Sequence, residues 1–179
     1  RNGTADLIKS HETDSDPEVA RVTIRNCNVH HSTGDEAIQL KYCTDCVIEC
    51  NVTHDVVQDG ICMAYSTRGI IRNCEIYNST SENAAIYVYN SYDMTVACNY
   101  IYNTTAANGI FLYKNYGTSH TVENNLIVNN AWQNGKRNYD EADGNTINIY
   151  KPEVYSSYFI KHNTLDNNTG VDGGGNPTG

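Results

Sequence analysis

A repeat of about two dozen residues runs along most of the chain and limits its fold more than any other feature. Six aligned segments begin at Val22, Cys46, Gly69, Thr95, Thr121 and Phe159. Most contain an apolar pair, a Cys or Asn, an apolar residue two positions on, a polar stretch, and then an apolar-x-apolar triplet. Short alternating runs without helical periodicity predict β-strands, and units of this length predict a solenoid of stacked coils.

One column of the repeat contains only small and amide residues: Cys27, Cys50, Cys74, Asn99, Asn125 and Asn163. Stacked coils lie about 4.8 Å apart, so this column predicts a ladder in a tight turn, with the amides bonded to backbone groups. In the second coil, the alignment places Val47 and Val52 in the core and Cys46 on the outside.

The distance between equivalent Cα atoms of neighbouring coils is within the range that a disulfide requires, so one disulfide between neighbouring coils is possible.

Two segments carry the full pattern most clearly, VTIRNCNVHHSTGDEAIQLK from Val22 and GIIRNCEIYNSTSENAAIYVY from Gly69. The pattern resembles the right-handed parallel β-helix repeat of pectate lyases, alginate lyases and C5-epimerases, and it covers residues 22–168. The resemblance implies an all-β, single-stranded, right-handed parallel β-helix of about six to seven coils with three short strands per coil. It also implies polysaccharide binding along one sheet and its bordering loops.

Composition limits the domain organisation and the partners. No composition break divides the chain, so residues 1–171 are expected to form one β-helix domain, cut from a longer solenoid or protein, and residues 172–179 a flexible tail. The net charge is −9, from 12 basic and 21 acidic residues, which disfavours nucleic acid and anionic membranes as partners. No apolar stretch is long enough for a membrane span. We expect an extracellular or cell-surface location, with any export signal already removed.

The apolar-x-apolar triplets define a sheet whose outward positions carry aromatic rings. Side chains alternate along a strand, so Ile86 and Val88 enter the core while the two intervening tyrosines point outward. Exposed rings at strand spacing suit the apolar faces of sugars, and binding of this kind requires no cofactor. The predicted carbohydrate site on this face comprises Tyr87, Tyr89, Phe111, Tyr113, Asn148 and Tyr150. It also includes Trp132 and Tyr139, which belong to the long insertion after Asn130.

Two other functions stay open. Tyrosine-rich outer faces, including Tyr100 and Tyr102, could instead join two copies of the chain in a homodimer or structural surface repeat.

The other alternative is a polysaccharide lyase or C5-epimerase acting on a uronate polymer, with Lys41 and Asp59 as its catalytic residues. The best candidate group for a calcium ion comprises Asp35, Glu36 and Asp59, which come just before the expected strands of the aromatic sheet in the sequence. Cys43, Cys46 and Cys50 are interpreted as structural, because zinc sites need paired ligands from two nearby segments.

Overall fold

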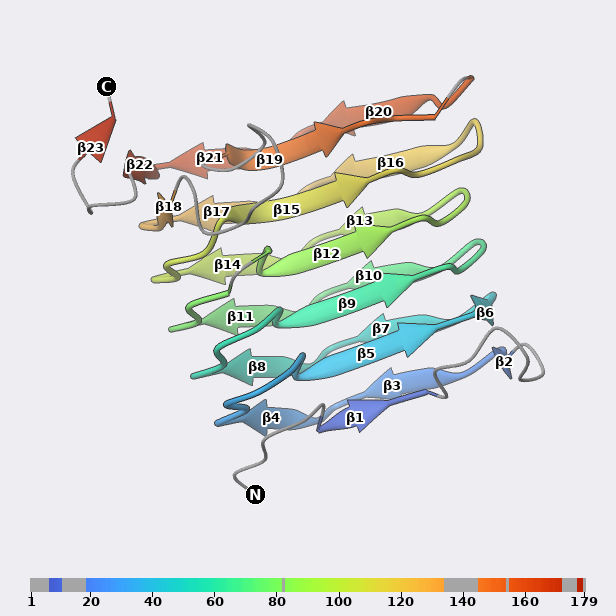
Figure 1. Cartoon of the computed structure of the whole chain (residues 1–179), viewed down its shortest axis with the longest axis horizontal. Coiled ribbons are helices and arrows are strands. Elements are labelled where there is room, and N and C mark those ends of the chain that lie inside the picture. Colours follow the sequence, from blue (N-terminus) through green and yellow to red (C-terminus); the bar gives the residue numbers. More distant parts are fainter. Residues whose placement is uncertain are drawn as a thin grey trace.

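The computed structural model describes residues 7–10, 19–81, 83–133, 145–153, 155–171 and 177–178. Within these residues the chain is a parallel β-solenoid with no helix, built from three long sheets that each contain six strands (Figure 1). Strands that follow one another around a coil belong to different sheets, and each pairs in parallel with its equivalent in the next coil. The all-β parallel solenoid with three strands per coil confirms the predicted fold class.

The first sheet contains β1 (Ile8–Lys9), β5 (Ile38–Lys41), β9 (Ile61–Ala64), β12 (Ile86–Tyr89), β15 (Asn108–Tyr113) and β19 (Asn145–Tyr150). The second sheet contains β3 (Thr23–Arg25), β7 (Val47–Glu49), β10 (Ile70–Arg72), β13 (Thr95–Ala97), β16 (His120–Glu123) and β20 (Tyr158–Lys161). The third sheet contains β4 (Asn28–His30), β8 (Val52–His54), β11 (Glu75–Tyr77), β14 (Tyr100–Tyr102), β17 (Leu126–Val128) and β21 (Thr164–Asp166). Smaller sheets are formed by β2 (Val19–Ala20) with β6 (Cys43–Thr44), and by β18 (Ala131–Gln133), β22 (Thr169–Val171) and β23 (Pro177–Thr178).

The described coils stack as about four complete turns, in which every strand of the three long sheets is paired on both sides. At either end, each long sheet finishes with a strand that is paired on one side only. The predicted count of six to seven coils is therefore too high, because it treated these end segments as complete turns. In the expected tail, Pro177 and Thr178 pair antiparallel with β22, whereas 172–176 and 179 lie outside the described residues.

The core is filled by aliphatic columns, one residue per coil. Ile38, Ile61, Ile86 and Ile110 are partners in register along the first sheet and are completely buried. Burying an isoleucine side chain contributes roughly 1.5–3 kcal/mol, so these columns contribute strongly to the stability of the stacked coils.

A ladder of side chains closes the turn between the second and third sheets, as predicted, but its second member is Asn51 and not Cys50. The Asn51 side chain accepts a hydrogen bond from the Cys27 backbone N–H at 3.0 Å and donates one to the Ile24 carbonyl at 2.9 Å. Asn99 continues the ladder, because its amide oxygen accepts from the Cys74 N–H at 3.0 Å. Cys50 lies one residue earlier, at an exposed corner with a φ of 54°.

The same offset runs through the whole second coil. Ile48 and Thr53 are the buried residues, and the predicted core residues Val47 and Val52 are only half-buried. A shift of one residue exchanges the two faces of a strand. The prediction was wrong because the core column is aliphatic in the other coils, so the alignment placed Val52 in it instead of its polar neighbour Thr53.

The cysteine pair of the second coil forms a disulfide. Cys43 and Cys46 are bonded to each other within one coil, so the bridge does not join neighbouring coils. Cys46 is completely buried in the main core, which corrects its predicted outward position. The other five cysteines form no disulfide: Cys27, Cys50, Cys62, Cys74 and Cys98.

Candidate functional site

The outer face of the first sheet carries the predicted aromatic residues in the predicted register. Tyr87 is paired with Phe111, and Tyr89 with Tyr113, while Tyr113 is paired in turn with Tyr150. None of these rings belongs to the main core. They form a second hydrophobic cluster on the other side of the sheet, together with Cys62, Ala64 and Ala84.

These rings are less exposed than the sequence suggested. Tyr87 and Tyr113 are each 8% exposed and Phe111 is 2% exposed, so the prediction that all five rings face solvent is wrong. Tyr87 stacks on Phe111 with ring centroids 5.5 Å apart, and Phe111 stacks on Tyr113 at the same distance. Stacked rings cover each other's faces.

A track of five tyrosines extends the aromatic face beyond the predicted residues, and its members other than Tyr113 are more accessible. The tyrosine track comprises Tyr42, Tyr65, Tyr89, Tyr113 and Tyr150, one from each of five successive coils. Successive ring centroids are 5.0, 5.2, 5.4 and 5.8 Å apart. Tyr65 is 37% exposed, and Tyr42, Tyr89 and Tyr150 are half-buried. The track therefore offers ring edges and hydroxyl groups along the stack of coils.

The alternation rule could not find Tyr42 and Tyr65. Each lies one residue beyond its strand, where continued alternation would point the side chain into the core. Their φ angles are 53° and 52°, in the left-handed region, so the chain turns at these residues. Their recurrence at the same distance from the triplets Ile38–Leu40 and Ile61–Met63 was the signal available in the sequence.

Two lysines flank the upper end of the tyrosine track. The Lys114 Nζ lies 5.2 Å from the ring centroid of Tyr113, and the Lys151 Nζ lies 5.0 Å from that of Tyr150. Both distances are within the range of cation–π attraction. Positive charge is thus held beside the rings, although the whole chain carries a net charge of −9.

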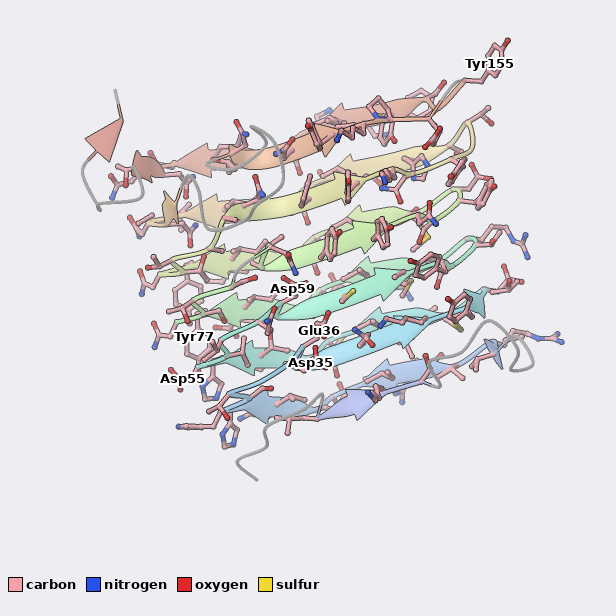
Figure 2. All side chains as sticks on the ribbon, viewed as in Figure 1. Asp35, Glu36, Asp55, Asp59, Tyr77 and Tyr155 are labelled. Atoms are coloured by element: carbon pink, nitrogen blue, oxygen red, sulfur yellow. A yellow bond between two sulfur atoms is a disulfide. The ribbon has the colours of Figure 1, made fainter. Side chains whose placement is uncertain are left out.

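The predicted acidic group lies on the near face of the first sheet, where β5 and β9 begin (Figure 2). Ligand atoms of Glu36, Asp59 and Cys62 lie within 4.8 Å of one another. Asp35 is adjacent rather than part of this group. A hydrogen bond with the Glu36 side chain lowers the pKa of Asp35, partial burial opposes this shift, and the nearby Lys41 contributes a smaller lowering.

Asp59 is held firmly in a closed environment. Its Oδ1 accepts hydrogen bonds from the Ser81 hydroxyl at 2.7 Å and the Ala84 N–H at 3.0 Å, and its Oδ2 accepts one from the Asn83 amide at 2.8 Å. The residue is completely buried. Such a carboxylate is a well-positioned ligand or structural group, but a polymer in solution cannot contact it directly. Lys41, the predicted base, lies at the end of β5 beside Ala64 of β9.

The sequence matches the family described as "Right handed beta helix region" over residues 11–176. This match covers nearly the whole chain. The chain belongs to the right-handed β-helix family.

Two solved structures resemble this β-helix chain at low sequence identity. One is the A-module of the mannuronan C-5 epimerase AlgE4 of Azotobacter vinelandii, with 13% identity, a TM-score of 0.34, and coverage of 86% of this chain and 62% of that chain. The other is a tailspike protein mutant of the E. coli bacteriophage HK620 in complex with a pentasaccharide, with 9% identity, a TM-score of 0.29, and coverage of 86% and 40%. This chain thus spans less than two thirds of either protein. No curated protein matches it.

The long insertion of this β-helix is described only at its beginning. The backbone of Trp132 lies in β18 and pairs with Gly170 of β22. The Trp132 side chain, Tyr139 and the rest of the insertion lie outside the described residues, so their place in a site stays a prediction. Asn148 is buried, and its amide donates to the Asn108 side-chain oxygen at 3.0 Å.

The third sheet carries a separate ladder of rings on its outer face. His30, His54, Tyr77 and Tyr102 stack in sequence with centroids 4.9, 4.8 and 5.0 Å apart. The Tyr102 hydroxyl donates to Glu75 at 2.8 Å, and desolvation, followed by this bond to Glu75, raises the pKa of Tyr102 to about 12. Dimerisation through this face stays a prediction. In the described part of the chain, no helix is long and apolar enough to cross a membrane.

Proposed function

We propose that this chain is a carbohydrate-binding β-helix module that holds a polysaccharide along the tyrosine track. The single observation that supports this function is the uninterrupted contact of five tyrosine rings over five successive coils. Tyrosine joins an apolar ring to a polar tip, and this combination suits a sugar, which has C–H faces and a rim of hydroxyl groups. A linear series of similar contacts fits an extended polymer better than a small ligand.

The flanking lysines favour an acidic polymer over a neutral one. Lys114 and Lys151 lie beside the upper rings of the track, and Lys41 lies on the same face near its lower end. Ammonium groups attract carboxylates at short range even on a chain whose total charge is negative. We therefore propose uronate-bearing polysaccharides as the preferred ligands, bound without a cofactor by a protein located outside the cell or at its surface.

Binding to a panel of neutral and uronate-bearing polysaccharides, measured by isothermal titration calorimetry, tests this function. The double variant Tyr65→Ser, Tyr89→Ser removes two neighbouring rings of the track. We expect its Kd to rise by about tenfold or more, equivalent to about 1.4 kcal/mol. The matched control is Tyr77→Ser, Tyr102→Ser, which removes two stacked rings from the third sheet and is expected to leave the Kd unchanged.

Equal weakening by both double variants, or no binding to any polysaccharide by the unmodified chain, would contradict the proposal. Replacement of Lys114 and Lys151 by glutamine should weaken binding to uronate polymers only, and more at low salt than at high salt. If this variant binds neutral and acidic polysaccharides equally weakly, the two lysines do not select for charge.

The same samples distinguish binding from catalysis. A lyase releases unsaturated uronate products, which are detected by their ultraviolet absorbance. Product formed by the unmodified chain and absent with Lys41→Ala would replace the binding proposal by the enzymatic one.

A further inference from the structure

Four polar side chains from two neighbouring coils gather where β5 and β9 begin, beside the aromatic cluster. Glu36 and Gln39 come from the β5 coil, and Asp59 and Cys62 occupy the equivalent positions of the β9 coil. Gln39 and Cys62 are partners in register, and the Ala37 N–H donates to the Asp59 carbonyl at 3.0 Å. The name "quartet" is used below for Glu36, Gln39, Asp59 and Cys62.

The quartet brings donor atoms to one point. A carboxylate oxygen of Glu36, a carboxylate oxygen of Asp59 and the Cys62 sulfur all lie within 4.8 Å of one another. Metal–ligand bonds of about 2.0–2.3 Å place two ligands of one ion less than this distance apart. A small rotation of these side chains would therefore be enough to share one ion.

Gln39 supplies an independent indication that a ligand belongs here. Its side chain is 2% exposed, and its Oε1 atom has no hydrogen-bond partner among the described residues. Buried polar atoms without partners are rare, and each requires an explanation. Gln39 is the register partner of Cys62 on the same face of the sheet, which makes its side chain a neighbour of the donor group.

The donor groups of the quartet lie in a largely buried part of the outer face. Asp59 and Cys62 are buried and Glu36 is half-buried. Buried charges in proteins are paired or coordinate metals. The bonds from Ser81, Asn83 and Ala84 orient the Asp59 carboxylate, as outer partners commonly do for metal ligands.

The donor set selects the kind of ion. Calcium and magnesium take oxygen ligands, whereas a thiolate together with carboxylates suits zinc and related transition metals. We propose that the quartet binds one divalent transition-metal ion of the zinc class, which joins the second coil to the third. This differs from the calcium site expected at Asp35, Glu36 and Asp59, because Cys62 takes the place of Asp35. The proposal does not depend on carbohydrate binding.

Cobalt(II) provides a direct test, because a thiolate bound to Co²⁺ gives a charge-transfer band in the near ultraviolet. The full chain, freed of metals with a chelator, is titrated with Co²⁺ and then with Zn²⁺ or Ca²⁺ as competitors. We expect one equivalent of Co²⁺ to produce the band, a stoichiometric amount of Zn²⁺ to remove it, and excess Ca²⁺ to leave it unchanged. Zn²⁺ should also raise the Tm of the chain, because it binds only the folded state.

Variants identify the ligands. Cys62→Ser should abolish the band, whereas the control Cys50→Ser, Cys98→Ser, which removes two exposed free thiols, should retain it. Glu36→Gln is a second test that keeps the thiol and the side-chain volume, and we expect it to weaken Zn²⁺ binding by about tenfold or more.

Several results would overturn the proposal. These are the absence of stoichiometric binding, loss of the band in the Cys50/Cys98 control, or competition by Ca²⁺ as effective as that by Zn²⁺. If Cys62→Ser does not fold, as judged by circular dichroism, unchanged Zn²⁺ affinity of Glu36→Gln would overturn it as well.

Discussion

His120 shows how a single side chain ties the stability of this chain to pH. It is completely buried, and its Nδ1 accepts a hydrogen bond from the Met94 N–H at 3.3 Å. The ring therefore carries its proton on Nε2, which donates to the Tyr116 carbonyl. Burial lowers the pKa of His120 below its ordinary value, and the bond to Tyr116 and the charge of Asp93 oppose this shift. The folded chain thus favours the neutral imidazole.

The sign of the pH dependence follows from this shift. Below about pH 6.5 the unfolded chain binds a proton at His120 that the folded chain does not, so the free energy of unfolding falls as pH falls. The slope from one such group is at most about 1.4 kcal/mol per pH unit. We expect urea denaturation between pH 7 and pH 5 to show this loss, and His120→Asn, which keeps an acceptor for Met94, to reduce it. An identical pH dependence in the variant would assign the loss to other groups, including His30, whose pKa is also lowered by desolvation.

At the scale of the element, the register of each strand is set by the column that it buries. In the third sheet, β4, β8 and β11 bury Val29, Thr53 and Ile76 in register. Thr53 is the polar residue among these three, and its hydroxyl has no hydrogen-bond partner among the described residues. The strand β8 keeps its register although Thr53 is polar, because Val29 and Ile76 pack on either side of it.

Thr53→Val is therefore expected to stabilise the chain. Valine has nearly the same shape and removes a buried hydroxyl that lacks a partner, a group whose desolvation costs about 1–3 kcal/mol. We expect the free energy of unfolding to rise by about 1 kcal/mol in urea denaturation. The control Thr23→Val, at an exposed position of β3, should change it by less than about 0.5 kcal/mol. A loss of stability in Thr53→Val would indicate that the hydroxyl is satisfied in solution.

At the scale of the whole molecule, the value of a core residue depends on its place in the stack. Ile71 and Ile160 belong to the same column of the second sheet, but Ile71 is 0% exposed and Ile160 is 48% exposed. Each coil of a solenoid contacts only its neighbours, so a residue of the last described coil is covered from one side.

Ile71→Ala is expected to cost about 3–4 kcal/mol and Ile160→Ala about 1 kcal/mol, because only the first leaves an enclosed cavity. Urea denaturation of the two variants checks this difference. Hydrogen exchange should show that Ile160→Ala loosens β20 and β21 while the central coils stay protected. Equal losses in both variants would mean that another part of the molecule covers the end coil in solution.

The repeat by itself determined the fold class, because a period of about two dozen residues with alternating apolar positions can bury its core only by stacking coils. It also placed Tyr87 and Tyr89 on the outer face. Strand alternation depends on local backbone geometry alone, so the two rings point outward whatever packs against that face.

The features that depend on neighbouring coils follow from three-dimensional packing. The choice of Asn51 over Cys50 for the ladder depends on which residue meets Cys27 of one neighbouring coil and Cys74 of the other. The tyrosine track depends on corners with left-handed φ, which turn Tyr42 and Tyr65 outward against the strand pattern. The quartet joins residues of two coils, and only the stacking register brings the Cys62 sulfur close to the carboxylates of Glu36 and Asp59. Sequence spacing describes one coil at a time, whereas contacts between coils are set by the packing of the stack as a whole.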